Sequence, residues 1–361
     1  MARPFSFTDP KRAKALSDAI RILAPPDPYK IVHVCGTHEM AITQSGLRRF
    51  LPDTVDLLEG PGCPVCVTPA TDIDAAAEIA RTGAIVCTFG DMIRVPGSHT
   101  SLDALRTEGC DVRTVLSADE ALRIARDTTQ DVVFFAVGFE TTTPMTAVIC
   151  LDDPPPNLSI LVSHKLIPQA MAALLNLPDN RIAAYLAPGH VSTIIGLAPY
   201  EEWLRERRIP TVVGGFEPLD ILYAVALLLR QSRDGVASVE NGYPRAVDDN
   251  GSPAARALVN EVFQVVDVAW RGIGVIRQSG LSLRPRFAQL DARQRFDVGV
   301  TEEVDEIPGC RCPDILTAQA VPSDCPLFAT RCTPLAPVGP CMVGTEGACN
   351  IWFRYNGERS L

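Results

Sequence analysis

A short apolar run that ends in a polar loop, in most cases with a glycine, recurs along the chain. The runs lie at residues 30–39, 83–91, 131–144, 158–165, 182–192 and 209–218. They are rich in β-branched residues and continuous rather than alternating in polarity. This pattern is typical of strands buried on both faces of a parallel sheet. It limits the fold to an α/β class.

Segments with helical signals separate these runs. They lie at 71–83, 117–127 and 217–231, and a further helix is predicted over 252–270. Alternation of strands and helices predicts doubly wound parallel sheets. We expect two Rossmann-like α/β domains over residues 1–118 and 119–234. Residues 235–361, whose later part is rich in proline, glycine and cysteine, are expected to form a third domain organised by a metal centre.

Charge and hydropathy exclude two classes of partner. The net charge is −10 with acidic and basic residues interspersed, so no basic face for nucleic acid is predicted. The longest apolar run, residues 221–229, is too short to cross a bilayer. The N-terminus has no apolar signal core. We therefore expect a soluble, cytoplasmic protein without membrane contact.

Polar side chains gather where the predicted strands end. In chain order they are Cys35, His38, Glu39, Asp91, Glu140, Thr141, His164, Lys165, His190 and Glu217. Ligands of open parallel sheets bind beyond the carboxyl ends of the strands. The recurrence predicts a shared cleft.

The stretch CGTHE, residues 35–39, carries the sharpest signal among these strand ends. Gly36 allows a tight turn after Cys35, and His38 lies within one helical turn of the thiol. Thiolate and imidazole together suit iron, zinc or copper. The alternative is a buried cysteine with a surface histidine, and this short stretch alone does not separate the two.

The stretch GPGCPVC, residues 60–66, places Cys63 and Cys66 in a bend with two residues between them. Their spacing fits a redox-active dithiol, half of a zinc site or two inert core residues. The redox pair is favoured because it needs no further ligand. The solitary cysteines Cys87, Cys110 and Cys150 are expected to pack in the core.

Six more cysteines fall within forty residues near the C-terminus. They are Cys310, Cys312, Cys325, Cys332, Cys341 and Cys349. In a cytosolic chain such clustering favours metal or redox chemistry over structural disulfides. No C-x-x-C pair typical of zinc is present, and four irregularly spaced thiolates suit a [4Fe–4S] cluster, with two left for a disulfide. A structural zinc is the alternative.

The order of these motifs resembles one known family. CGTHE, GPGCPVC, GFETT, PGHVS, GGFEP, WRGIG and the tail DCPLFATRCTPLAPVGPCMVGTEGACNIWFRY occur as in the hydrogenase maturation (hydrogenase formation) proteins of the HypD family. The resemblance covers nearly the whole chain. One departure is Pro313, where the family usually has glycine.

The resemblance implies a scaffold and redox protein for the Fe(CN)2CO unit of [NiFe] hydrogenases. Iron would be held by Cys35 together with a HypC-type chaperone, and cyanide would come from a HypE-type partner. The implied [4Fe–4S] ligands are Cys310, Cys325, Cys332 and Cys349. The implied redox pairs are Cys312 with Cys341 and Cys63 with Cys66.

Two neighbours of Cys35 receive roles as hypotheses. His38 would be a second iron ligand or a proton donor, and Glu39 would orient it. Two rival functions remain at this point. One is a free-standing iron–sulfur oxidoreductase that acts on thiols and disulfides, and the other is a zinc-stabilised binding module.

Overall fold

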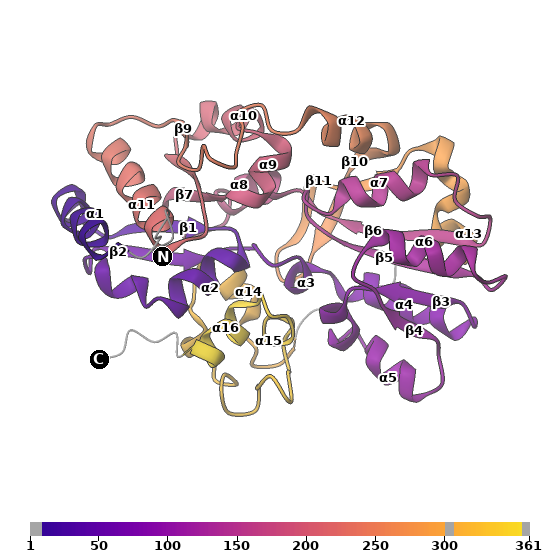
Figure 1. The fold of residues 1–361 in the computed structure, drawn as a ribbon. Coiled ribbons are helices and arrows are strands. Elements are labelled where there is room, and N and C mark those ends of the chain that lie inside the picture. The colour runs from indigo at the N-terminus through magenta and orange to yellow at the C-terminus, as the bar shows by residue number, and fades with distance from the viewer. Residues whose placement is uncertain (1–8, 300–306, 356–361) are drawn as a thin grey trace, which may run out of the picture.

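The computed structural model describes residues 9–299 and 307–355. Two α/β halves lie side by side, and the C-terminal segment, residues 307–355, packs beneath their junction (Figure 1). The left half in this view contains a sheet, called sheet A, and the right half contains sheet B. In this arrangement the CGTHE and GPGCPVC loops lie in the middle of the molecule (Figure 1).

Sheet A has five parallel strands among the described residues, in the order β2-β1-β7-β8-β9. Helices cover both of its faces. The helices α1 and α11 pack on one face, and α8 and α9 contribute to the core on the other. The strands are β1 (Tyr29–His33), β2 (Val55–Glu59), β7 (Ile182–Pro188), β8 (Thr211–Gly214) and β9 (Val239–Asn241).

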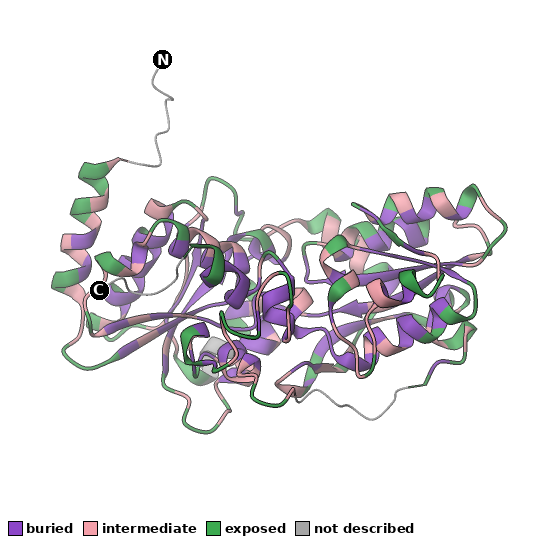
Figure 2. Ribbon diagram, turned by 90° about the horizontal axis from the view of Figure 1, so that it is seen from below, coloured by how far each residue is buried: buried purple, intermediate pink, exposed green. Residues whose placement is uncertain are grey.

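Sheet B has four parallel strands within the described ranges, in the order β4-β3-β5-β6. The helices α6 and α7 pack on one face, and α4 and α5 pack on the other. In Figure 2 the strands of both halves are buried along most of their length. The strands are β3 (Ile85–Thr88), β4 (Val112–Thr114), β5 (Val132–Gly138) and β6 (Leu158–His164).

The helices connect and flank these strands. The α-helices are α1 (Pro10–Leu23), α2 (Gly36–Gln44), α3 (Pro64–Val67), α4 (Ala70–Arg81), α5 (Leu102–Thr107), α6 (Ala118–Arg126), α7 (Thr143–Leu151), α8 (Ile167–Leu174), α9 (Gly189–Ile195), α10 (Ala198–Arg207), α11 (Pro218–Arg233), α12 (Pro253–Val262), α13 (Ala292–Arg295), α14 (Cys312–Leu316), α15 (Pro340–Val343) and α16 (Ala348–Tyr355). The 3-10 helices are η1 (Leu47–Phe50), η2 (Gly90–Arg94), η3 (Pro285–Leu290) and η4 (Pro322–Asp324).

The α/β class and the six predicted strands are confirmed. Each of the six apolar runs contains a strand of a parallel sheet, and the helices predicted over 71–83, 117–127 and 217–231 are α4, α6 and α11. Ser117 caps α6 by accepting a hydrogen bond from the Glu120 N–H (3.4 Å). Local patterns therefore predicted the elements that alternate along the chain.

The two sheets divide the chain differently from the expected segments 1–118 and 119–234. Sheet A joins strands from residues 29–59 with strands from residues 182–241, and sheet B is formed between them in sequence. The segment 235–361 is likewise shared, because β9 completes sheet A and α12 packs against α7. Pairing between distant strands leaves no trace in local periodicity.

The helix predicted over 252–270 is wrong in its second half. The helix α12 ends at Val262, and Phe263–Trp270 forms β10, which pairs in antiparallel register with β11 (Gly274–Leu283). The sequence FQVVDVAW contains three valines, whose branched side chains favour a strand. None of the described helices combines the length and the apolar character needed to cross a bilayer.

Candidate functional site

The strand order of each sheet reverses at one point, where ligands of open parallel sheets bind. In sheet A the reversal lies between β1 and β7, so Cys35 and His190 follow the two strands concerned. In sheet B it lies between β3 and β5, which are followed by Asp91 and Glu140. The polar strand ends therefore belong to two crevices rather than one.

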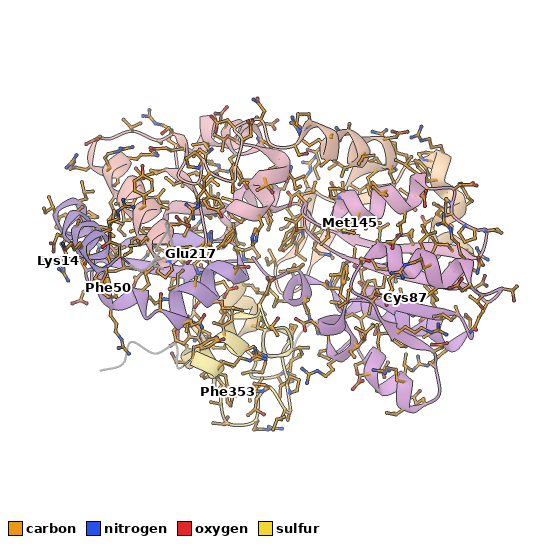
Figure 3. All side chains as sticks on the ribbon, in the orientation of Figure 1. Lys14, Phe50, Cys87, Met145, Glu217 and Phe353 are labelled. Atoms are coloured by element: carbon orange, nitrogen blue, oxygen red, sulfur yellow. A yellow bond between two sulfur atoms is a disulfide. The ribbon has the colours of Figure 1, made fainter. Side chains whose placement is uncertain are left out.

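The predicted strand-end residues are divided between these crevices. Cys35, His38, Glu39, His190 and Glu217 follow strands of sheet A, whereas Asp91, Glu140, Thr141, His164 and Lys165 follow strands of sheet B. Figure 3 labels Glu217 in the first half and Cys87 in the second. The expectation of a single shared cleft is therefore not met, because the ten residues follow or end strands of two separate sheets.

Cys35 is the N-cap residue of α2 and is 9% exposed. Burial raises the pKa of its thiol to about 11, although the backbone N–H groups of His38 and Thr37 oppose the shift. The thiol is therefore protonated at neutral pH. A bound metal ion would reverse this preference, since metals bind the thiolate.

The CGTHE and GPGCPVC loops are in direct contact. The Gly36 N–H donates a hydrogen bond to the carbonyl oxygen of Gly62 (3.3 Å), and the Gly60 N–H donates to that of His33 (2.8 Å). A Cβ atom at Gly62 would lie 2.1 Å from the backbone nitrogen of Cys35. Only glycine allows the two loops to approach so closely.

Cys63 and Cys66 form a disulfide at the start of α3, with their Cα atoms 5.3 Å apart. Cys63 is the N-cap residue, and Pro64 follows at the first helical position. Both cysteines are almost fully buried, at 1% and 0% exposure. The pair is the one that the resemblance implies, and its loop lies against Cys35.

A second disulfide joins Cys312, at the start of α14, to Cys341 in α15. Short helix α15 packs against α3, and all four disulfide cysteines belong to one apolar cluster. The two disulfides therefore lie in neighbouring elements. Pro313, the departure from the family pattern, lies in the first turn of α14 and contacts Gly272.

The C-terminal segment connects the two crevices. The backbone N–H and the hydroxyl of Thr345 donate hydrogen bonds to Asp91 Oδ2 (3.0 and 3.1 Å), beyond sheet B. The hydroxyl of Thr37, beyond sheet A, donates to Glu346 Oε1 (3.2 Å). The backbone of Glu346 also lies so close to Gly36 that a Cβ atom there would clash with it. The C-terminal segment therefore holds the CGTHE loop in place through its contacts with Thr37 and Gly36.

His38 is fully buried, and its ring is neutral at physiological pH. Burial lowers its pKa to about 3, with His33 contributing. Its Nε2–H donates to the carbonyl oxygens of Gly214 (3.3 Å) and Gly215 (3.1 Å). Within the described part of the chain Nδ1 has no hydrogen-bond partner. A proton-donor role does not fit such a ring, whereas Nδ1 has a lone pair that could bind a metal.

Glu39 does not orient His38, so that hypothesis is wrong. Its carboxylate accepts hydrogen bonds from His33 (2.8 Å), Arg48 (2.7 and 2.9 Å), Thr43 (2.5 Å) and Trp352 (2.8 Å). Burial alone would raise the pKa of Glu39, but Arg48 and His33 hold it well below its usual range. Glu39 is a buried anchor between α2, η1 and α16.

The four remaining C-terminal cysteines have free thiols that lie near one another. They are Cys310, Cys325, Cys332 and Cys349. Burial raises the pKa of Cys349 well above its usual value, and the other three thiols add to the shift. No three metal-binding side chains converge on a single point in the described residues. The four free thiols are a donor set that could hold a metal ion or an iron–sulfur cluster.

Two groups near the site were not singled out from the sequence. Glu59, at the end of β2, is a buried carboxyl with no hydrogen-bond partner among the described groups. The hydroxyls of Tyr200 and Ser192 are hydrogen bonded (3.1 Å). Burial raises the pKa of Tyr200, and Glu140 and Cys35 add to the shift, so the tyrosine lies near the two crevices. Glu59 directly precedes the GPGCPVC loop, a position that could have drawn attention to it.

The buried carboxyl of Glu140 lies in the crevice beyond sheet B, and its pKa can be tested through the pH dependence of stability. Burial raises the pKa of its carboxyl to about 8, so folding favours the protonated form. Stability from this group is complete below pH 4.5 and is lost as the pH rises to 8, by an amount on the order of 4 kcal/mol. We expect Glu140→Gln to lose less stability than the wild type between pH 5 and pH 8 in urea unfolding. The glutamine keeps the oxygen that accepts from the Ile167 N–H. An equal loss in both proteins would contradict the assignment.

Comparison with known proteins shows the family to which the chain belongs. Residues 11–356 match the sequence model of the HypD family, described as "Hydrogenase formation hypA family". A putative hydrogenase expression/formation protein of Methanocaldococcus jannaschii is 44% identical over 95% of this chain and 96% of its own length. The hydrogenase maturation factors HypD2 of Bradyrhizobium diazoefficiens and HypD of Azotobacter vinelandii are 44% and 43% identical, over 98% of this chain and 96% of theirs. The chain belongs to the HypD family of hydrogenase maturation factors.

Proposed function

We propose that this protein is the scaffold on which the Fe(CN)2CO unit of [NiFe] hydrogenases is assembled. The observation that carries the proposal is the contact between three segments. The loop of Cys35, the disulfide loop of Cys63 and Cys66, and the C-terminal segment meet at the junction of the two halves. A site that holds iron while the ligands of that iron are exchanged needs a soft donor such as a thiolate to bind the metal. It also needs redox-active groups beside that donor.

Cys35 is the proposed anchor for the iron that is being assembled. Its buried thiol loses its proton when the metal binds, and the N–H groups of Thr37 and His38 then support the thiolate. His38 Nδ1 is a candidate second ligand. A HypC-type chaperone would supply a further cysteine from outside, and a HypE-type partner would supply cyanide.

Cys310, Cys325, Cys332 and Cys349 are the proposed ligands of a resident [4Fe–4S] cluster. Such a cluster supplies single electrons. The residues themselves contribute largely buried thiols. Burial raises the pKa of Cys310, and the backbone N–H of Cys312 and, to a smaller extent, Arg271 oppose the shift. The four cysteines share the C-terminal segment with the Cys312–Cys341 pair, which supports an exchange of electrons between the proposed cluster and this disulfide.

The two disulfides form the proposed redox path to Cys35. When Cys312 and Cys341 are reduced, one of their thiolates attacks the Cys63–Cys66 disulfide and forms a mixed disulfide. The second thiolate then breaks that bond, which leaves Cys63 and Cys66 as a dithiol and restores Cys312–Cys341. Two electrons and two protons move in total. The packing of α15 on α3 supports this order.

Metal analysis and infrared spectroscopy test the function. Protein purified anaerobically with its chaperone should contain about four irons and four sulfides in the cube, one further iron, and bands from cyanide and CO. Iron and sulfide without bound diatomic ligands would favour the alternative, a free-standing iron–sulfur thiol/disulfide oxidoreductase. Zinc without sulfide would contradict both.

A further inference from the structure

Two consecutive residues, Val338 and Gly339, contact two of the four free thiols of the C-terminal segment. The backbone N–H of Val338 donates a hydrogen bond to Cys332 Sγ (3.3 Å). Gly339 is the N-cap residue of α15, and a Cβ atom on it would lie 2.7 Å from Cys310 Sγ. The dipeptide therefore lies against sulfurs that come from two separate parts of the segment.

Glycine at position 339 is needed for space and not for backbone conformation. Its φ and ψ are −99° and 156°, an extended conformation that any residue adopts. A methyl group here would overlap the sulfur of Cys310, whereas the next nearest atom, the Cβ of Cys312, would be 3.8 Å away. A free thiol can rotate away from that methyl group into another rotamer. A thiolate bonded to a metal cannot rotate, so the clash matters only when the site is loaded.

The hydrogen bond from Val338 acts on the charge of the same site. Cys332 is only 5% exposed, so little water can stabilise negative charge on its sulfur. A backbone N–H directed at this sulfur replaces part of the lost solvation. Hydrogen bonds to the sulfurs also influence the reduction potential of an iron–sulfur cluster. They raise it, because the reduced form carries more negative charge and gains more from each donor.

The dipeptide also adjoins the second disulfide. Pro340 and Cys341 follow Gly339 at the start of α15, and Cys341 is bonded to Cys312. The Cβ of Cys312 is one of the atoms nearest to Gly339. Contacts with two free thiols and with one disulfide are therefore concentrated in four consecutive residues, 338–341.

We propose that Val338 and Gly339 are positioning residues for the metal group held by the four free thiols. Gly339 leaves the space in which Cys310 Sγ binds the group, and the Val338 N–H stabilises the charge on Cys332 Sγ. The proposal rests on the function proposed above, in which Cys310, Cys325, Cys332 and Cys349 hold a resident cluster. It assigns to two residues without metal-binding side chains the retention of the group and part of its reduction potential.

Gly339→Ala and its matched control Gly344→Ala test the space for Cys310. Gly344 lies at the other end of α15, its φ is also negative (−76°), and its Cβ would be an ordinary 3.5 Å from the nearest atoms. Each full-length protein is reconstituted anaerobically with iron and sulfide, and iron loss to bathophenanthroline disulfonate is followed. We expect Gly339→Ala to lose iron at least about tenfold faster than wild type, and Gly344→Ala to match wild type. Without metal, the two variants should unfold at the same urea concentration.

Val338→Pro and its control Val338→Ala test the hydrogen bond to Cys332. Proline has no N–H, whereas alanine keeps the N–H and shortens only the side chain. The reduction potential of the reconstituted site is measured by redox titration with electron paramagnetic resonance. We expect the potential to fall in Val338→Pro and to keep its wild-type value in Val338→Ala. In the wild type, the Val338 amide should exchange with deuterium more slowly once the site is loaded, a measurement that needs no variant.

Equal rates of iron loss from Gly339→Ala and wild type would overturn the proposal. The same acceleration in both glycine variants would overturn it too, because the loss would then come from the ends of α15 and not from the sulfur. An unchanged potential in Val338→Pro, or an amide exchange rate that loading does not alter, would remove the role of Val338.

The proposed cluster can fail separately from this proposal. A wild-type protein that holds zinc and no sulfide on these cysteines would contradict the function proposed above. Faster zinc loss from Gly339→Ala than from Gly344→Ala would then still support the positioning role, and equal loss would overturn it. A wild-type protein that binds no metal at the four cysteines would contradict both.

Discussion

Replacing Cys35 with serine is expected to abolish assembly of the iron unit while the proposed cluster stays in place. Serine keeps the size of the side chain and the N-cap position of α2, but a hydroxyl does not offer the soft thiolate that iron with cyanide and CO requires. The infrared bands of cyanide and CO should disappear from the complex with the chaperone. Hydrogenase activity in cells carrying the variant should fall at least about 100-fold.

A matched substitution shows whether this loss is specific. Cys110→Ser changes another free thiol, which is more accessible than Cys35 and packs against the core of the half built on sheet B. It should leave the bands, the iron content and the activity unchanged. Retention of the cyanide and CO bands in Cys35→Ser would remove Cys35 from the site. Loss of the sulfide in that variant would mean that it had damaged the C-terminal segment instead.

Local sequence patterns identified the central strands and several helices, but not how these elements assemble. The runs that became β1, β3, β5, β6, β7 and β8 are buried on both faces, and continuous apolar runs indicate such strands. Which strands share a sheet depends on pairing between residues more than a hundred positions apart, as between β1 and β7. The periodicity of either strand carries no information on its distant partner.

The candidate site shows the same division. Unusual residue types at unusual density, the cysteines above all, drew attention to Cys35, to the GPGCPVC loop and to the C-terminal segment. Contacts made by common residues were not predictable. The hydrogen bonds of Thr345 to Asp91 and of Trp352 to Glu39 join positions that are 254 and 313 residues apart. Such contacts are set by the complete fold.

We expect Glu39→Gln to lower the free energy of unfolding by about 3–5 kcal/mol. This is the second of the two largest effects that we predict. The substitution preserves the shape but removes a fully buried charge to which Arg48 donates two hydrogen bonds and His33 one. The folded pKa of Glu39 is depressed, so its contribution is present above the ordinary pKa and is lost as the pH falls. The difference from wild type in urea unfolding should therefore be largest near pH 7 and smaller in acid.

Trp352→Phe is the matched control, because it removes one neutral donor to Glu39 and keeps the aromatic bulk of α16. Its cost should be only about 1 kcal/mol. Glu39 fixes α16 to α2, so Glu39→Gln should also make the C-terminal segment more sensitive to limited proteolysis and weaken retention of its proposed cluster. Equal costs for the two variants would mean that the charge of Glu39 contributes little. In that case packing alone would hold the C-terminal segment against the CGTHE loop.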